Sequence, residues 1–389
     1  MTNSKFNDKM LSKQIAQQLL ENNILKFWQT RMIDNERGGF YGRIDGHNTL
    51  HPDEPKGAIL SARILWTFAA AARVLHNTPY RILAARAYDY LMQRFIDREK
   101  GGVYWSLNAD GTPLDTKKQT YAIAFAIYGL AEYVRLTDNQ EALEAAKRLF
   151  LDIEGHAFDA EHIGYIEALT CDWQPIEDMR LSEHDENGAF TMNTHLHVLE
   201  AYTNLYRVWP NEHLAQQLRT LISIFVNRIY NPENGHLDLF FDQEWHGKRD
   251  KNSPGHDIEA AWLLHETLDV LGDDTLLQET LPVCQQLAQA AEDGILQESQ
   301  WWCYAEAVVG YVDQWQSNKD VKPMEVMINL EMAEAAWEFI NTHLIDREHG
   351  EWYWGILPDG TPDTDNDKAG FWKCPYHNSR MCLEIIERL

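Results

Sequence analysis

Ionisable and aromatic side chains recur near the start of successive apolar segments in this sequence. The segment FTMNTHLHVLEAY carries Asn193 and His197, and the segment GHDIEAAWLL carries His256 and Glu259. Charged groups are rare inside proteins unless they are paired or functional. The pattern predicts a polar pocket formed by Arg63, Tyr121, Asn193, His197, His256, Glu259, Trp262, Trp302, Glu306, Trp372, His377 and Arg380.

This combination of side chains is suited to moving a proton beside a sugar carbonyl. Histidine exchanges protons near neutral pH, arginine can stabilise an oxyanion, and tryptophan can stack on a pyranose ring. A cyclic sugar has no free carbonyl, so an acid or base must first open the ring. Loss of the C2 proton then gives an enediolate. Returning the proton to the opposite face of C2 gives the epimer, whereas returning it to C1 gives a ketose.

Helical spacing indicates which side chains share a face. Asn193 and His197 are four residues apart and lie on one side of a helix, whereas His195 and His197 lie nearly opposite each other. We therefore expect His197, and not His195, to face the pocket. The same argument disfavours a metal site at HLH, and no metal is predicted.

Two other kinds of protein fit part of this pattern. A glycoside hydrolase would use Glu259 and Glu306 as its two carboxylates, but it has no need of three histidines. A non-catalytic sugar-binding protein would explain the tryptophans but not the histidines. The sequence has no phosphate loop, dinucleotide fingerprint or serine elbow, so no cofactor is predicted.

The elements that position these residues come in six pairs. More polar amphipathic segments lie at about 10–32, 80–95, 139–153, 212–229, 274–291 and 326–343. Apolar segments lie at about 57–76, 119–136, 190–208, 256–271, 302–316 and 376–388. The apolar set is typical of buried helices and the polar set of an outer layer.

Turn sequences separate the two kinds of helix, and two of them are nearly identical: DREKGGVYWSLNADGTP from Asp97 and DREHGEWYWGILPDGTP from Asp346. Weaker copies start at Asp34, Asp159, Asn231 and Glu292. Asp, Asn and Gly favour a turn, and the alternating aromatic residues favour a short strand. Six such repeats predict an all-α (α/α)6 barrel with short β-hairpin loops at one mouth. An open solenoid is the alternative. No linker-like stretch divides residues 1–389, so a single domain is predicted.

The formal net charge of −26 argues against nucleic acid and anionic membranes as partners. The five cysteines form no CxxC pair, and MTNSKFNDKM lacks the apolar core of a signal peptide. No stretch is apolar enough to span a bilayer. We expect a cytoplasmic protein, a monomer or weak homo-oligomer, whose partner is a small-molecule disaccharide.

Seven motifs resemble the N-acylglucosamine 2-epimerase superfamily over nearly the whole chain. They are GGFYG, KGAILSARILW, GGVYW, TMNTHLHVLEAYTNLY, GHDIEAAWLL, WWCYAEAVVG and WKCPYHNSRMCLE. The resemblance implies a cofactor-independent epimerase on the barrel derived above. His377 and His197 would exchange the C2 proton on opposite faces, and His256 would open the ring with support from Glu259 and Glu306. Arg63 would stabilise the enediolate, and Trp302 and Trp372 would hold the two sugar rings.

The WKCPYHN stretch and the tryptophan pair favour a disaccharide over a monosaccharide. The expected reaction inverts C2 of the reducing-end glucose or mannose of a β-1,4-linked disaccharide such as cellobiose, lactose or mannobiose. Relatives in this superfamily include N-acetylglucosamine 2-epimerase and mannose isomerase, so a monosaccharide epimerase or aldose–ketose isomerase is the alternative.

Overall fold

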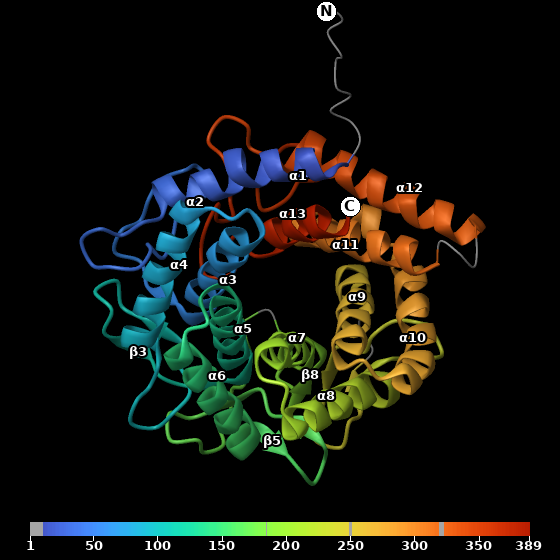
Figure 1. Ribbon diagram of the computed structural model, residues 1–389, viewed down its shortest axis with the longest axis horizontal. Helices are drawn as coiled ribbons and strands as arrows, with labels where there is room; N and C mark the ends of the chain where they lie inside the picture. The colour runs from blue at the N-terminus through green and yellow to red at the C-terminus, as the bar shows by residue number, and fades with distance from the viewer. Residues whose placement is uncertain (1–10, 184, 249–250, 319–322) are drawn as a thin grey trace, which may run out of the picture.

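The computed structural model describes residues 11–183, 185–248, 251–318 and 323–389. Within these residues, two concentric rings of helices surround a central axis (Figure 1). The inner ring consists of α3 (Ala58–Val74), α5 (Thr120–Thr137), α7 (Met192–Val208), α9 (Pro254–Leu271), α11 (Trp301–Asn318) and α13 (His377–Arg388). The outer ring consists of α1 (Lys13–Leu19), α2 (Leu25–Arg31), α4 (Thr78–Tyr90), α6 (Gln140–Asp152), α8 (Glu212–Ile224), α10 (Asp274–Glu292) and α12 (Pro323–Phe339).

The inner ring is closed. Each inner helix packs on the next one along the chain, and α13 contacts both α11 and α3. Six of the outer helices pack on an inner neighbour, for example α1 on α13, α4 on α3 and α6 on α5. The predicted (α/α)6 barrel is therefore confirmed, and the chain is not an open solenoid.

The inner helices are buried on nearly all sides, as their apolar sequences predicted. Every residue of α5 from Thr120 to Val134 is buried. Small residues let these helices approach closely: a Cβ on Gly129 of α5 would lie 2.7 Å from the carbonyl oxygen of Ala62 in α3. Substitution of Gly129 would thus force the two helices apart.

The outer helices end in a feature that the sequence did not reveal. Four of them run into a single π-helical turn, Leu91–Phe95, Ile153–Ala157, Phe225–Ile229 and Ile340–Leu344, and a fifth such turn, Leu20–Ile24, joins α1 to α2. The first four turns are each followed by a residue in extended conformation, for example Ile96 with ψ 120°. These turns redirect the chain from the outer helix into the hairpin.

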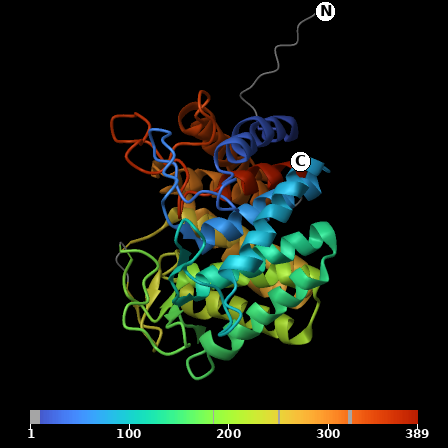
Figure 2. The ribbon, with the colours of Figure 1, turned by 90° about the vertical axis from the view of Figure 1, so that its left-hand side faces the viewer.

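The hairpins gather at one end of the barrel (Figure 2). Their strands are short: β1 (Lys56–Gly57), β2 (Ser106–Leu107), β3 (Pro113–Asp115), β4 (Lys118–Gln119), β5 (Phe158–Asp159), β6 (Gly164–Tyr165), β7 (Ala168–Leu169), β8 (Phe190–Thr191), β9 (Phe240–Phe241) and β10 (Gly247–Lys248). All pairings are antiparallel, in the orders β1-β2-β3, β8-β9-β10, β4-β7 and β5-β6. A 3₁₀ turn, Ile295–Gln297, precedes α11.

Strand pairing fixes where each inner helix begins. The strand that leads into an inner helix pairs with the hairpin of the next repeat: β1 before α3 with β2, β4 before α5 with β7, and β8 before α7 with β9. Gln300, just before α11, likewise bridges to Gly355 of the last hairpin. The amino ends of the inner helices are thereby held level at this mouth.

The repeated turn sequence has a physical explanation. One carboxylate oxygen of Asp97 accepts hydrogen bonds from the backbone N–H groups of Glu99 and Lys100, and the other binds the ammonium group of Lys118 at 2.7 Å. Asp34 and Asp346 repeat this arrangement with Lys56 and Lys368. Each aspartate thus closes its turn and ties it to the lead-in segment of the following inner helix.

No helix in the described part of the chain combines the length and the apolar character that a bilayer-spanning segment requires.

Candidate active site

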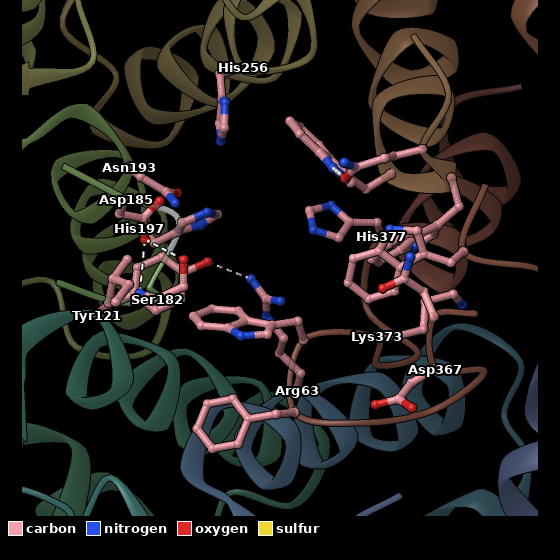
Figure 3. Close-up of a pocket in the computed structure, with 18 of the residues that line it drawn as sticks. Arg63, Tyr121, Ser182, Asp185, Asn193, His197, His256, Asp367, Lys373 and His377 are labelled. Atoms are coloured by element: carbon pink, nitrogen blue, oxygen red, sulfur yellow. Dashed lines mark hydrogen bonds between the residues drawn. The ribbon is translucent and has the colours of Figure 1, made fainter. Parts of the chain in front are cut away.

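A cavity of about 1000 Å³ opens at the hairpin end of the barrel, above the amino ends of the inner helices. The rings of His197 from α7, His256 from α9 and His377 from α13 point into one common space from three sides (Figure 3). Arg63 reaches toward the same space from α3. The fold therefore brings together side chains that are up to 314 residues apart in the chain (377 − 63 = 314).

His197 is oriented by a carboxylate on its own helix. Its Nδ1 lies 2.8 Å from Glu200, one turn further along α7. This bond places the proton on Nδ1 and leaves Nε2 as the basic nitrogen. Burial lowers the pKa of His197 in spite of Glu200, so the ring is neutral near pH 7. A neutral ring with a free Nε2 can accept a proton.

His377 has the same arrangement, with a carboxylate from a different helix. Its Nδ1 lies 2.7 Å from Glu306 of α11. The indole N–H of Trp262 also donates to Glu306, at 3.0 Å. Burial, together with Arg63 and Arg380, lowers the pKa of His377 well below its ordinary value. His377 is a second neutral base facing the cavity.

His256 differs from the other two histidines. Its Nδ1 lies 2.7 Å from the hydroxyl of Ser253, and no carboxylate among the described residues bonds to the ring. Burial lowers the pKa of His256 to about 3. Because a hydroxyl can donate or accept, His256 can present either tautomer to the cavity. This freedom suits exchange of a proton between two oxygens.

Three carboxylates share one guanidinium beneath the cavity. Arg380 binds Glu200, lies 2.5 Å from Glu259 and lies 2.7 Å from Glu306. Burial raises the pKa of Glu200, but Arg380, His197 and Tyr376 together outweigh it and lower this pKa to about 2. Burial and the neighbouring Glu306 raise the pKa of Glu259, which lines the cavity. Glu259 can therefore hold a proton beside His377.

Glu259, Glu306 and His377 could also be considered as metal ligands, because their donor atoms lie within 4.8 Å of one another. However, Arg380 already binds both carboxylates. A metal ion would have to displace this buried guanidinium or share the carboxylates with it. The donor set therefore fits an internal ion-pair cluster better than a metal centre.

The cavity wall contains both aromatic and amide groups. Trp302 lies 4.7 Å from the His256 ring, and Trp372 lies 6.3 Å from the Tyr121 ring, both between ring centroids. The Oδ1 atom of Asn193 is buried and has no hydrogen-bond partner among the described residues. It can accept a hydrogen bond from a bound hydroxyl group. Such a wall fits a polyhydroxylated ring molecule.

Comparison with known proteins agrees with this geometry. The family model for N-acylglucosamine 2-epimerase (GlcNAc 2-epimerase) matches residues 39–380. The chain belongs to this family. It is 51% identical to a cellobiose 2-epimerase of Bacteroides fragilis, over 96% of this chain and 98% of that protein. A cellobiose 2-epimerase of Ruminococcus albus is 39% identical, over 97% of this chain and 99% of that protein.

A solved structure shows the same fold. The cellobiose 2-epimerase of Bacillus thermoamylovorans B4167 superimposes with a TM-score of 0.90 at 38% identity, covering 97% of this chain and 99% of that chain. The relatives and the family model together identify the chain as a sugar epimerase.

The structure places most of the predicted site residues of this epimerase on the cavity wall. Arg63, Tyr121, Asn193, His197, His256, Glu259, Trp302, Trp372 and His377 all line the cavity. His195 does not, because its ring bonds to the backbone of Tyr165 and Thr191. The helical-face argument thus distinguished the two histidines of HLH.

Three residues predicted for the site lie behind the wall. Trp262 and Glu306 bond to each other, and the guanidinium of Arg380 is only 1% exposed because it is packed against three carboxylates. Trp262 and Arg380 had been expected to contact substrate, and the structure does not place them on the cavity. Spacing of three or four residues identified their face of the helix correctly. It carries no information on how far behind the cavity wall a side chain lies.

Sequence reasoning missed four residues that orient the site. Glu200 stands three residues after His197, the spacing that had already linked His256 to Glu259, so a signal was present. Ser253 precedes its helix and gave no periodic signal. Lys373 and Asn378 flank His377 closely in sequence, and both bind Glu351 of the last hairpin. This long-range contact has no counterpart in local sequence.

Proposed function

We propose that this enzyme inverts C2 of the reducing-end hexose of β-1,4-linked disaccharides, with cellobiose converted to glucosylmannose. Lactose and mannobiose would be converted in the same way to epilactose and mannosylglucose. The observation that carries the proposal is the pair of carboxylate-bound histidines, His197 and His377, that enter one cavity from different helices. Inversion at carbon needs a proton carrier on each face of the reacting carbon.

The acid–base steps follow from the hydrogen bonds. His256, whose tautomer is not fixed by a carboxylate, opens the pyranose by moving a proton between the C1 hydroxyl and the ring oxygen, with Glu259 beside it. One of the two carboxylate-bound histidines then removes the C2 proton through its Nε2. The other takes up a proton from solvent on its Nε2, delivers it to the opposite face of C2, and the ring closes again, while the first histidine releases its proton to solvent. We assign removal from glucose-type substrates to His377 and delivery to His197.

The negative charge that develops during proton removal lies near Arg63. Arg63 lines the cavity, and only 3% of this residue is exposed. A buried cation next to the forming enediolate oxygens stabilises them strongly, because little water screens the interaction. No step in this scheme requires electrons or a transferred group from a cofactor.

The cavity favours a disaccharide over a single hexose. Trp302 and Trp372 lie on different elements of the wall, α11 and the segment before α13, so each can cover one sugar ring. The two relatives compared above carry the name cellobiose 2-epimerase. The alternatives, a monosaccharide isomerase and an N-acetylglucosamine 2-epimerase, would leave part of this wall unused.

The carboxylate geometry does not favour hydrolysis. Hydrolases of this kind place two carboxyl groups on either side of a glycosidic bond. Here Glu259 and Glu306 bind the same nitrogen of Arg380, so they lie on the same side, and only Glu259 lines the cavity.

The proposal also covers the cellular context. It includes a monomer or a weak homo-oligomer as the form of the enzyme in solution. All five cysteines are unpaired thiols, which suits the reducing cytoplasm.

Product analysis tests the proposal. The purified chain would be incubated separately with cellobiose, lactose, mannobiose, mannose and N-acetylglucosamine, and the products separated by chromatography. We expect C2 epimers of the disaccharides at rates well above those of the monosaccharides. Ketoses as main products would indicate an isomerase, and free glucose from cellobiose would indicate a hydrolase; either would overturn the proposal.

A further inference from the structure

Two arginines are buried at the base of the same cavity, and their charges are balanced very differently. Arg380 is paired with Glu200, Glu259 and Glu306. Arg63 forms no ion pair with any aspartate or glutamate in the described part of the chain. The polar contacts of its guanidinium are the Tyr121 hydroxyl at 2.8 Å and the Cys374 sulfur at 3.5 Å.

Neutral aromatic rings surround the rest of Arg63. Its guanidinium carbon lies 4.0 Å from the centre of the Phe125 ring and 4.4 Å from that of Tyr376. Its Nε is buried and has no hydrogen-bond partner among the described residues. A buried cation is normally paired with an anion, because burial without one is costly. Arg63 is therefore missing a counter-ion in a cavity that a ligand can enter.

The other cations on the cavity wall do not share this property. Arg43 binds Asp367 at 2.8 Å and Glu54 at 3.3 Å, and Lys373 binds Glu351 at 2.8 Å. The three histidines add no further positive charge, because burial lowers the pKa of each and keeps the rings neutral. The inner helices also direct their amino ends, which carry partial positive charge, to this mouth.

We propose that the cavity has an anion position at Arg63 that binds the C1 carboxylate of an open-chain disaccharide aldonate. An aldonate is the sugar acid formed when the reducing-end aldehyde is oxidised. Its carboxylate is planar and places negative charge at C1, next to C2. The enediolate has the same two features, but Arg63 would meet it only briefly during the reaction. Aldonates would thus be competitive inhibitors of the enzyme, a ligand class distinct from its neutral substrates. This inference rests on the proposed function, because it assumes that Arg63 faces the C1–C2 end of the sugar.

The test compares two open-chain ligands that differ only at C1. Cellobionate carries a carboxylate there, and cellobiitol carries a neutral CH₂OH group. Binding to the intact enzyme would be measured at pH 7.5 by titration calorimetry and by tryptophan fluorescence, since Trp302 and Trp372 line the cavity. We expect cellobionate to bind at least about tenfold more tightly, because a charge-assisted hydrogen bond in a buried site is stronger than a neutral one.

Two variants show whether Arg63 is responsible. In Arg63→Met the preference for cellobionate should fall to about one, because the unbalanced charge is gone. In Arg43→Met it should stay as in the unchanged enzyme, because that arginine is already paired with two carboxylates. Circular dichroism would check that both variants fold; Arg63→Lys, which keeps the charge, serves as a second variant and should keep part of the preference.

The outcomes separate this inference from the proposed function. If cellobiitol binds and cellobionate binds no more tightly, the anion position is refuted while the proposed function stands. If the preference survives in Arg63→Met, the anion lies elsewhere and the assignment to Arg63 is wrong. If neither ligand binds while the enzyme is folded, both the inference and the proposed disaccharide specificity fail.

Discussion

His195 and His197 are two residues apart on one helix, yet they have different environments. Both ring nitrogens of His195 bond to the main chain, at 2.9 Å to Tyr165 and 2.7 Å to Thr191, and burial lowers its pKa to about 4. His195 therefore joins α7 to the third hairpin. His197 bonds to one carboxylate and presents its other nitrogen to the cavity.

We expect opposite effects when each histidine is replaced by alanine. His195→Ala should lower the free energy of unfolding by about 1–3 kcal/mol, because it leaves buried main-chain groups unpaired, and should leave kcat of the folded enzyme within a few fold. His197→Ala should reduce kcat by at least about a hundredfold, the usual scale for loss of an acid–base group. Denaturant titration and initial rates check both. The reverse ranking would mean that the wrong histidine has been placed at C2.

The pH profile of kcat/KM follows from the lowered pKa values of the histidines. His197 and His377 act as bases when neutral. Burial lowers the pKa of each ring below the ordinary value of 6.5. Activity should therefore fall only at a pH below 6.5, as these rings finally take up protons. The same sign applies to stability, because below pH 6.5 the unfolded chain binds protons that the folded chain does not. Circular dichroism at each pH separates the two effects. An acid limb centred at or above pH 6.5 in folded enzyme contradicts the assignment.

At the scale of elements, the two nearly identical turn fragments differ at one informative position. Where the second hairpin has Gly102, the last one has Glu351, and both adopt a left-handed backbone, with φ of 67° and 63°. Glutamate is strained there and glycine is not. The carboxylate of Glu351 binds Lys373 and Asn378 on either side of His377, and also the indole of Trp28. The strain is offset by contacts that hold the segment around His377.

Glu351→Gly tests this explanation. If Glu351 only formed a turn, the change would relieve strain and stabilise the protein. We expect instead a lower melting temperature, and a kcat reduced by about tenfold with a smaller change in KM, because His377 loses its anchor but the sugar-binding wall remains. Gly102→Ala, a substitution at the equivalent position of the second hairpin, controls for general damage to a hairpin. An unchanged kcat in folded Glu351→Gly would show that Lys373 and Asn378 do not need this anchor.

Elements were more predictable from sequence than contacts. The six apolar segments became the inner helices because period and composition depend only on local sequence, as in α5. The π-helical turns were not predicted, since the shift from i+4 to i+5 bonding depends on the hairpin that follows. The depth of Trp262 and Arg380 was not predictable either, because it depends on residues from α7 and α11 that helical spacing cannot locate.

At the scale of the whole molecule, the end of the barrel opposite the cavity carries a closed circuit of polar bridges. Arg73 of α3 bonds to Glu132 of α5 and to Glu387 of α13. The remaining links around the ring are Glu132–Asn204, Arg207–Glu266, His265–Asp313 and Asp313–Arg388. Every neighbouring pair of inner helices is thus joined at least once at this level. The circuit holds the ring closed without contributing to the cavity.

Breaking this circuit should affect stability and not catalysis. Glu132 is 1% exposed and binds Arg73, Arg135 and Asn204. We expect Glu132→Gln to lower the free energy of unfolding by about 1–3 kcal/mol, since two partly exposed arginines lose a buried partner, with kcat retained. Glu144→Gln, which breaks an exposed pair with Lys147, should cost less than about 1 kcal/mol. Equal costs in thermal or denaturant unfolding would mean that the circuit adds nothing to stability.

The central claim is that two histidines on opposite faces of C2 exchange its proton through an enediolate. The most direct test is proton NMR of the enzyme incubated with cellobiose in D2O. Because the proton delivered to C2 comes from a different histidine than the one that removed it, we predict reducing-end signals of the mannose-type epimer with deuterium at C2. An epimer that keeps its original C2 proton would contradict the two-histidine account, and release of free glucose would contradict epimerisation altogether.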